Sequence, residues 1–210
     1  MVNEKPRKRV RVGDLQTIQR TQRACRRFDP DQAVQDSDLQ EMLEAAVHAP
    51  SAENTQPWRF VVVRDPRSRG LLASWWSESW RADYVRQNVS DDVLYNDLEF
   101  GLAGGGFASA PVIVVVCADV GRVPEDFAPA SIFPAVQNML LAANDLEYGS
   151  CLTTGLTIMY AEQVRQLLGL PDELLPMAAV YIGRPARTLA PPRRTPAAAV
   201  TFRERYGSPW

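Results

Sequence analysis

Apolar residues recur at helical spacing before position 50 and form a continuous run after position 57. One face of the predicted helix is formed by five apolar residues, Leu39, Met42, Leu43, Ala46 and Val47. Ser37 and Gln40 fit a capping box at the start of this helix, and Pro50 stops it. The run from Phe60 to Val63 is rich in β-branched and aromatic residues, so it predicts a strand.

Helical and strand patterns alternate along the rest of the chain. Asp14 can cap a first helix with Leu15 and Ile18 facing inward, and this helix is expected to extend into residues 22–28. The continuous apolar run at 111–117 predicts a central strand that is covered on both faces. The pattern therefore indicates helices packed against a sheet.

The second half of the chain continues this pattern. Ser131 is expected to cap a helix that is apolar on nearly all sides, with Pro134 in its first turn and Gly149 at its end. Such a helix is buried either in the core or in a dimer interface. A short helix that ends at Gly169 precedes a predicted strand at 177–182.

The loop between the first strong helix and its strand is rich in hydrogen-bonding side chains. Ser51, Asn54, Thr55 and Gln56 lie between two prolines. Amides both donate and accept hydrogen bonds, which suits the rim of a flat heterocycle with carbonyls, an imide and ring nitrogens. An ordinary polar turn is the alternative interpretation.

Composition restricts the chemistry that this chain can carry. Its 210 residues are 46% hydrophobic with a net charge of -2, so nothing global indicates disorder, nucleic acid or an anionic membrane as a partner. His48 is the one histidine, and Lys5 and Lys8 are the two lysines. These counts nearly exclude histidine metal sites, a Ser–His relay and lysine Schiff-base chemistry.

The three cysteines, Cys25, Cys117 and Cys151, are widely spaced, which favours neither a disulfide framework nor a zinc site. No apolar run is long enough to span a bilayer, and the start of the chain is polar. We therefore expect a soluble, cytoplasmic protein without a metal site.

Two further stretches are candidates for a binding site. Arg23 and Arg26 are three residues apart, and on one helical face two guanidinium groups would suit a phosphate; a solvated cationic face is the alternative. The turn at 149–155 carries two threonines and two glycines, which can direct backbone N–H groups toward a ligand, although an ordinary turn has the same composition.

Between the strand at 60–63 and the glycine-rich segment 101–106 lies a tryptophan-rich stretch. Four aromatic residues recur there at helical spacing, namely Trp75, Trp76, Trp80 and Tyr84. They fit either core packing or a wall that stacks on flat substrates. The glycines precede a strand rather than follow one, so we interpret them as a linker and not as a phosphate loop.

The sequence Pro-Ser-x-x-Asn-x-Gln-Pro-Trp at 50–58, after an amphipathic helix and before a strand, resembles the flavin loop of the nitroreductase family. The helix segment Gln-Asn-Met-Leu-Leu-Ala-Ala at 137–143 is also similar to that family, and the resemblance runs from about Leu15 to Pro196. It implies an α+β fold with a central mixed β-sheet flanked by helices, and a homodimer in which a C-terminal segment extends onto the partner subunit.

The resemblance also implies an organisation of the chain. The basic, proline-interrupted composition of residues 1–12 predicts a mobile arm, and the resemblance implies that residues 13–210 form a single FMN-binding domain. A lid would lie at about 71–100 and a C-terminal arm at about 184–210. The four aromatic residues of the tryptophan-rich stretch would belong to the substrate lid.

The resemblance further assigns the cofactor residues. The set implied for FMN is Gln22, Arg23, Arg26, Pro50, Ser51, Ala52, Asn54, Gln56, Thr153, Thr154, Gly155, Arg193 and Arg194. Thr154 and Gly155 would supply catalytic backbone donors near flavin N5. Gln22 and Ala24 replace an arginine and a serine of the family pattern, so two hydrogen bonds common in the family are weakened or missing.

The reaction implied is ping-pong electron transfer from NADH or NADPH through FMN to a nitroaromatic, a quinone or a similar flat acceptor. Flavin fragmentation, substrate dehydrogenation and reductive dehalogenation on the same fold remain alternatives. A non-catalytic protein that binds nucleic acid through its basic arm is a third interpretation, which the net charge disfavours.

Overall fold

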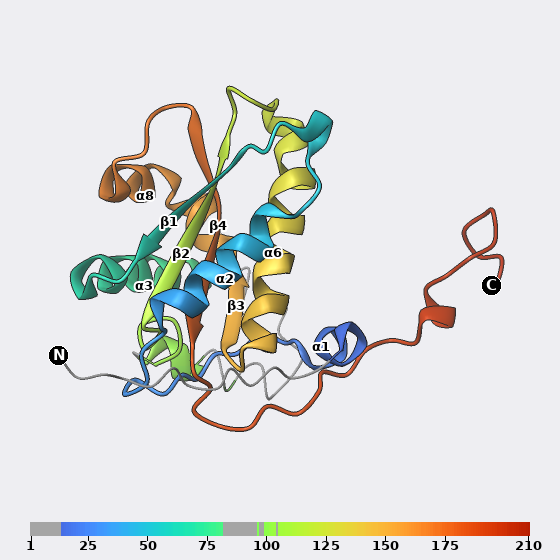
Figure 1. The fold of residues 1–210 in the computed structure, drawn as a ribbon, viewed down its shortest axis with the longest axis horizontal. Helices are drawn as coiled ribbons and strands as arrows, with labels where there is room; N and C mark the ends of the chain where they lie inside the picture. The colour runs from blue at the N-terminus through green and yellow to red at the C-terminus, as the bar shows by residue number, and fades with distance from the viewer. Residues whose placement is uncertain (1–13, 82–95, 97–98, 104) are drawn as a thin grey trace.

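The fold is described by a computed structural model that covers residues 14–81, 96, 99–103 and 105–210 (Figure 1). The predicted basic arm and Tyr84 lie outside these residues. The main helices are α1 (Leu15–Thr21), α2 (Asp36–Val47), α3 (Pro66–Arg81), α6 (Ala128–Asp145), α7 (Gly155–Met159) and α8 (Ala161–Leu168). The strands are β1 (Trp58–Val63), β2 (Val112–Asp119), β3 (Gly149–Thr153) and β4 (Leu174–Gly183). Short 3₁₀ turns are η1 (Ala52–Asn54), η2 (Glu125–Phe127) and η3 (Ala197–Ala199).

The four strands form one sheet in the order β1-β2-β4-β3, and each neighbouring pair is antiparallel. A parallel pairing is added by the single bridge between Ala24 and Ser150. β2 is a central strand, buried from Val112 to Ala118, as its continuous apolar run predicts. The α+β class is therefore confirmed.

Helices cover both faces of the sheet (Figure 1). On one face, α2 and α6 pack against Val112, Val114 and Val116 of β2. On the other face, α3, α7 and α8 pack in the cluster that contains Ile113 and Val115. Alternate residues of β2 thus enter opposite cores, as the two-residue period of a strand requires.

The start of α2 differs from its predicted cap. The helix begins at Asp36 after the N-cap residue Gln35, which makes no capping hydrogen bond through its side chain. Ser37 lies inside the first turn, and its hydroxyl donates to Asp38, so the predicted capping box with Gln40 is wrong. Asp36 and Asp38 in the first turn instead stabilise this end of the helix, because their negative charges interact favourably with the helix dipole. At the other end, Val47 is exposed rather than buried.

The first helix is shorter than predicted. Asp14 caps it as expected, because its carboxylate accepts a hydrogen bond from Thr17 N at 2.8 Å. The helix ends at Thr21, Leu15 is exposed, and Ile18 is half-buried. The following residues form strand-like bridges at Ala24 and Phe28. The prediction that Arg23 and Arg26 share a helical face is therefore wrong.

The long helix α6 begins at Ala128, so Ser131 is not its cap. η2 precedes it directly, which means that the chain is already helical before Ser131 is reached. Pro134 accordingly lies inside the helix, and the helix ends at Asp145 rather than at Gly149. The predicted turn at 149–155 is instead β3 followed by Thr154, the N-cap residue of α7, and by Gly155, its first residue.

The chain beyond Gly183 leaves the sheet and runs past α1, and its end lies far from the rest of the protein (Figure 1). Its tip carries exposed apolar residues, including Val200, Tyr206 and Trp210. Phe202 pairs with Pro209 and packs against the Tyr206 ring, so the tip has local structure of its own. Of the helices that the structure describes, none has the length and apolar character that crossing a membrane requires.

Candidate functional site

The loop that follows α2 has an unusual backbone. Glu53, Asn54 and Gln56 have φ values of 51°, 55° and 50°, in the left-handed region that residues other than glycine rarely adopt. Ser51 Oγ accepts a hydrogen bond from Gln56 N at 3.0 Å, and Gln56 Nε2 donates to Asn54 Oδ1 at 3.2 Å. Several strained residues in one short loop are typical of a functional site.

The loop also presents unused hydrogen-bonding groups. Asn54 and Gln56 are both exposed, as are Pro50 and Ala52. Within the described residues, the amide nitrogen of Asn54 and the amide oxygen of Gln56 make no hydrogen bond. The NH2 group of Asn54 and the amide oxygen of Gln56 therefore remain as a donor group and an acceptor for a ligand with polar groups on its rim.

The loop is attached to the core through α6. Ala52 N donates to Ser131 Oγ at 3.1 Å, and Ser131 is fully buried. The sequence indicated Ser131 as a helix cap, but the structure gives it this long-range role.

A second group of candidate residues lies at the other end of α6. Asn144 Nδ2 donates to the Ile18 carbonyl and to Thr21 Oγ1, which holds the end of α1 in place. Gln22 and Arg23 follow directly, and both line a cavity of about 400 Å³. The remaining lining residues are Thr21, Asn144, Glu147, Tyr148, Gly149, Ser150, Pro185, Arg187, Thr188 and Leu189. A volume of this size is in the range of small-molecule sites.

Arg23 also contacts the C-terminal segment. Its Nη1 donates to the Ala190 carbonyl at 2.7 Å. Arg193 and Arg194 follow Ala190 within a few residues and are exposed, so an extended chain places them within roughly 10–14 Å of this contact. The structure thus brings three of the predicted phosphate-binding arginines onto neighbouring segments.

Arg26 has a different environment. It is half-buried, and its charge acts on the thiol of Cys151 and the phenol of Tyr181. Burial raises the pKa of Cys151, and the nearby Arg26 guanidinium partly opposes that increase. The sequence interpretation treated Arg23 and Arg26 as equivalent, but their side chains contact different parts of the protein.

Thr153, Thr154 and Gly155 lie where β3 ends and α7 begins. Thr153 is three residues beyond Ser150, so β3 spans about 10 Å from the cavity to this turn. A Cβ atom on Gly155 would lie 3.1 Å from Ser79 Oγ, which shows how closely α3 packs on the turn. Glycine permits that close approach.

The tryptophans of α3 divide into two groups. Trp76 is buried in the core, where it stacks on Phe107 with ring centroids 5.5 Å apart. Trp75 and Trp80 are half-buried, and Trp75 stacks on Tyr160 of the α7–α8 junction at 6.3 Å. The Tyr160 hydroxyl donates to Glu78 at 2.8 Å. Trp76 therefore packs the core, whereas Trp75 and Trp80 retain exposed surface.

Within one chain, the loop at 50–56 and the Gln22–Arg23 cavity do not meet. Ser131 and Asn144 anchor them near opposite ends of α6, and a helical rise of 1.5 Å per residue separates these anchors by about 20 Å. Figure 1 shows η1 beside the start of α6 and α1 beside its end.

Sequence reasoning missed several residues around these sites. Arg187 and Tyr148 line the cavity. Asp119 at the end of β2 and Arg122 in the turn after it donate to the Pro57 and Thr55 carbonyls. No local motif marks these residues, because each acts through contacts far away in sequence. Within the described residues, no group of three or more His, Cys, Asp or Glu side chains is placed to hold a metal ion.

Comparisons with known proteins agree with this architecture. The model of the Nitroreductase family matches residues 20–184. An Archaeoglobus fulgidus protein named as an NADH dehydrogenase/NAD(P)H nitroreductase is 32% identical over 171 residues, 79% of this chain and 82% of its own. An NADH dehydrogenase of Thermus thermophilus is 32% identical over 198 residues, 88% of this chain and 93% of its own.

Solved structures give the same result. A Desulfovibrio desulfuricans protein described as a nitroreductase in complex with FMN is 28% identical and has a TM-score of 0.70; the match covers 92% of this chain and 98% of that one. An FMN-bound nitroreductase of Desulfitobacterium hafniense, 24% identical with a TM-score of 0.69, shares the fold over 89% of this chain and 96% of its own. The family match, the two relatives and the shared fold lead to one conclusion: this chain belongs to the nitroreductase family.

Proposed function

We propose that this protein is an FMN-dependent oxidoreductase that takes electrons from NADH or NADPH and passes them to a nitroaromatic, a quinone or a similar flat acceptor. The observation that carries the proposal is the strained loop at 51–56, which presents a free amide donor and acceptor within a family whose members are crystallised with FMN. The relatives named for NADH or NAD(P)H support the choice of donor.

The donor set of the chain fits FMN chemically. Guanidinium groups of Arg23, Arg193 and Arg194 suit a phosphate dianion, and hydrogen bonds to charged groups contribute about 1.5–3 kcal/mol each. The amides of Asn54 and Gln56 suit the carbonyl and imide edge of the ring. Gln22, beside Arg23 in the cavity, can donate a neutral hydrogen bond in place of the arginine of the family pattern.

The complete site requires two subunits. Within one chain, the loop that would hold the ring and the cavity beside Arg23 that would hold the phosphate are anchored about 20 Å apart, near the two ends of α6. We infer a homodimer in which one subunit supplies Arg23, Arg193, Arg194 and the turn at Thr153–Gly155, and its partner supplies the loop at 50–56.

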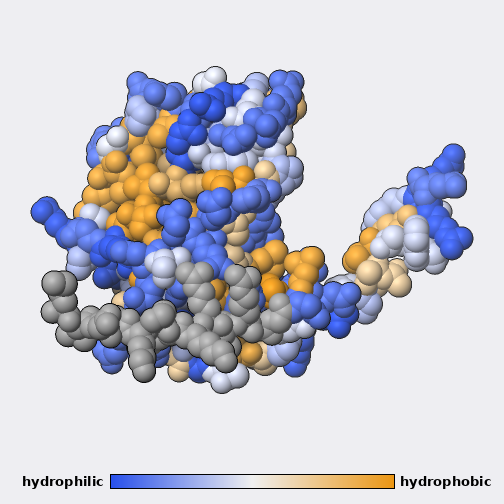
Figure 2. Space-filling model, in the orientation of Figure 1, coloured by the Kyte–Doolittle hydropathy of each residue, from blue (hydrophilic) through white to orange (hydrophobic). Residues whose placement is uncertain are grey.

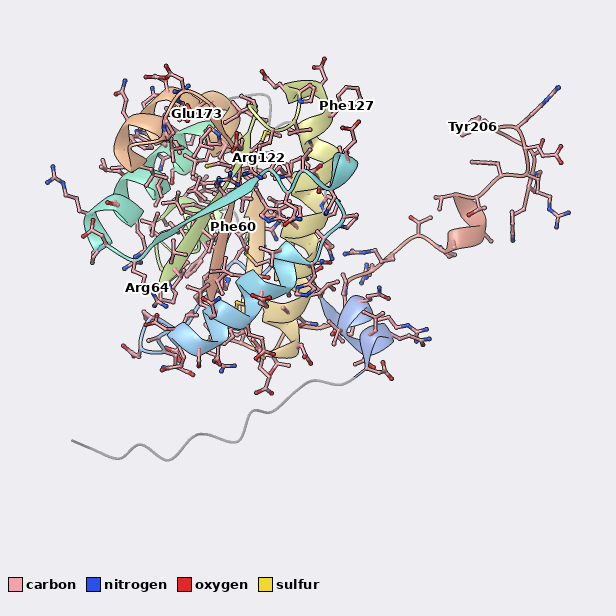
Figure 3. The ribbon with its side chains drawn as sticks, turned by 45° about the horizontal axis from the view of Figure 1, so that its top comes forward. Phe60, Arg64, Arg122, Phe127, Glu173 and Tyr206 are labelled. Atoms are coloured by element: carbon pink, nitrogen blue, oxygen red, sulfur yellow. The ribbon has the colours of Figure 1, made fainter. Side chains whose placement is uncertain are left out.

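Exposed apolar surface supports the dimer. Figure 2 shows apolar residues gathered over the β1 side of the sheet, where Val62 is exposed and Phe60 is half-buried. The aromatic tip of the C-terminal segment lies away from its own subunit, with Tyr206 at its end (Figure 3). Both surfaces would lose contact with water if the C-terminal segment extended onto a partner.

Bound FMN would supply the redox chemistry, taking two electrons from the reduced nicotinamide and giving them to the acceptor in a ping-pong cycle. The chain would position the ring and tune its electrostatics. Backbone N–H groups at Thr154 and Gly155 would stabilise negative charge at the ring edge, because preorganised donors need no reorientation during the reaction. Trp75 and Trp80 would give the acceptor an aromatic surface to stack on.

The test is spectroscopic. Purified protein should show a flavin absorption band, or gain one when FMN is added, and the band should bleach under anaerobic conditions with NADH or NADPH. A nitroaromatic or quinone should then restore it. Protein that binds no FMN would contradict the proposal, and FMN that neither donor reduces would exclude this reaction cycle.

A further inference from the structure

A cluster of charged residues beside the loop has no place in the function described so far. Asp119 ends β2, and its side chain is only 14% exposed. Its Oδ2 atom lies 2.7 Å from Arg59 Nη2 and 3.4 Å from Arg122 Nε. We call Arg59, Asp119 and Arg122 the Asp119 brace.

The brace contacts the loop directly. Arg122 Nη1 donates to the Thr55 carbonyl at 3.2 Å, and Asp119 N donates to the Pro57 carbonyl at 2.7 Å. These two carbonyls flank Gln56, whose φ is 50°. Figure 3 shows Arg122 near the loop end of β1. The brace therefore holds the backbone on both sides of the last left-handed residue.

Arg122 is itself fixed by the turn that carries it. Arg122 N donates to the Asp119 carbonyl at 3.0 Å, and Gly121 N donates to Asp119 Oδ1 at 3.2 Å. Asp119 thus orients both the backbone and the guanidinium of Arg122. The Asp119 carboxylate and the Thr55 carbonyl together orient the Arg122 guanidinium toward the loop.

This arrangement exceeds what closing a turn requires. Left-handed residues other than glycine persist only where the surrounding structure holds them. Ser131 holds the start of the loop at Ala52, and the brace holds its end at Thr55 and Pro57. The residues between these contacts are Glu53 and Asn54, both with positive φ.

We propose that the Asp119 brace is a positioning device for the flavin ring, and this inference rests on the proposed function. Arg122 and Asp119 fix the backbone at Thr55–Pro57, so that the side chains of Asn54 and Gln56 are held in a binding arrangement before the ligand arrives. Preorganisation of this kind raises affinity by removing an ordering cost. Because the brace acts on the ring and not on the phosphate, it affects FMN and riboflavin equally.

The first experiment measures the dissociation constants of FMN and riboflavin by quenching of flavin fluorescence. In Arg122→Ala, we expect both constants to rise about tenfold, the effect of one hydrogen bond. Arg122→Lys, which keeps a charged donor, should recover part of the affinity for both flavins. Arg165→Ala serves as the control, because Arg165 of α8 forms a single ion pair with the exposed Asp172 and contacts no part of the candidate site that the structure describes.

Arg23→Ala should give a different pattern, because Arg23 is proposed to bind the phosphate and the brace is proposed to act on the ring. It should weaken FMN much more than riboflavin, because riboflavin has no phosphate. Asp119→Asn, which removes the charge and keeps the shape, should behave like Arg122→Ala. The Arg122 side chain is 54% exposed, so its truncation is compatible with folding.

A second experiment needs no flavin. Hydrogen exchange of the peptide that contains Gln56 should accelerate in Arg122→Ala, because Gln56 N depends on the loop geometry for its bond to Ser51 Oγ. Exchange of the central β2 amides should stay unchanged.

The outcomes separate the two proposals. Wild-type protein that binds neither flavin would contradict the proposed function, and with it this inference. If wild-type protein binds both flavins and Arg122→Ala binds them as tightly as Arg165→Ala does, the positioning role of the Asp119 brace is wrong and the proposed function still stands. Loss of affinity for FMN without loss for riboflavin would also overturn it, as would loop exchange that does not change.

Discussion

Ser131 and Asn144 lie on the same helix, α6, and each anchors a different part of the candidate site. Ser131 Oγ accepts the Ala52 N–H, and Asn144 Nδ2 donates to the Ile18 carbonyl and the Thr21 hydroxyl. One buried helix thus fixes both the amide loop and the segment that leads into Arg23. Through these two residues, α6 positions both parts of the candidate site relative to each other.

Replacing Ser131 should loosen the loop. In Ser131→Ala, the Ala52 N–H loses its acceptor at a part-buried position, and the loss of one such hydrogen bond costs about 0.5–1.5 kcal/mol. We expect a lower free energy of unfolding in urea and weaker binding of FMN. Ser37→Ala is the control, because Ser37 caps nothing and should change stability little. Equal stability of the two variants would argue against the anchor.

Site assembly from two subunits can be tested by complementation. Arg23→Glu should remove the phosphate contact, and Asn54→Ala should remove the loop amide. Each homodimer should bind FMN poorly, but a mixture unfolded and refolded together should regain binding, because a mixed dimer contains one site with both parts intact. If both parts came from one chain, every site in the mixture would carry one defect, and no recovery would be seen.

Two tryptophans of α3 should respond differently to truncation. Trp76 is 2% exposed and stacks on Phe107, so Trp76→Ala should lower the free energy of unfolding by about 3–5 kcal/mol. Trp75 is half-buried against Tyr160, so Trp75→Ala should destabilise the protein less and raise KM for flat acceptors. Chemical denaturation and steady-state kinetics give the two readouts. A Trp75 variant with unchanged acceptor preference would exclude its role in the lid.

The cysteines should be unreactive in the folded protein. Cys25, Cys117 and Cys151 are all buried, and burial raises the pKa of Cys117 to about 12. A thiol reagent such as DTNB needs the thiolate, so native protein should react slowly and denatured protein should titrate three thiols. Fast reaction before denaturation would show that the core opens locally.

Stability should fall at alkaline pH. Burial raises the pKa of Tyr181 well above the usual 10.0, and burial with a hydrogen bond to Asp38 raises the pKa of Tyr148. Because the folded pKa exceeds the unfolded one, this stabilisation is fully present below pH 10 and is lost as pH rises toward the folded pKa. Urea midpoints measured from pH 8 to 12 should decline, and Tyr181→Phe should flatten the decline. An unchanged slope in Tyr181→Phe would contradict the assignment.

Local sequence patterns correctly predicted the helices and strands in which local preference and tertiary packing favour the same structure. The apolar run of β2, the end of α8 at Gly169 and the helix–loop–strand unit around residues 50–58 all appear in the structure. Gly169 adopts a φ of 62°, which explains why glycine ends that helix. These signals work because they depend on neighbouring residues alone.

The sequence predictions were wrong where contacts between distant parts of the chain determine the local structure. Serine often caps a helix, but α6 begins three residues before Ser131, directly after η2. The Ser131 hydroxyl instead accepts a hydrogen bond from Ala52 N. Arg23 and Arg26 have helical spacing, but the bridge between Ala24 and Ser150 draws the chain into an extended form. The brace at Asp119 was not predicted, because its contacts with Arg59 of β1 and with the Thr55 carbonyl join segments about 60 residues apart in sequence.

The length of α6 has a consequence for how this chain can vary. Since one rigid rod carries an anchor near each end, adding or removing a helical turn between Ser131 and Asn144 would shift every site of an assembled dimer at once, by about 5.4 Å. Surface loops elsewhere can absorb insertions without moving any ligand-binding group. We therefore expect relatives to vary freely in loop length and to keep the number of residues between these two anchors.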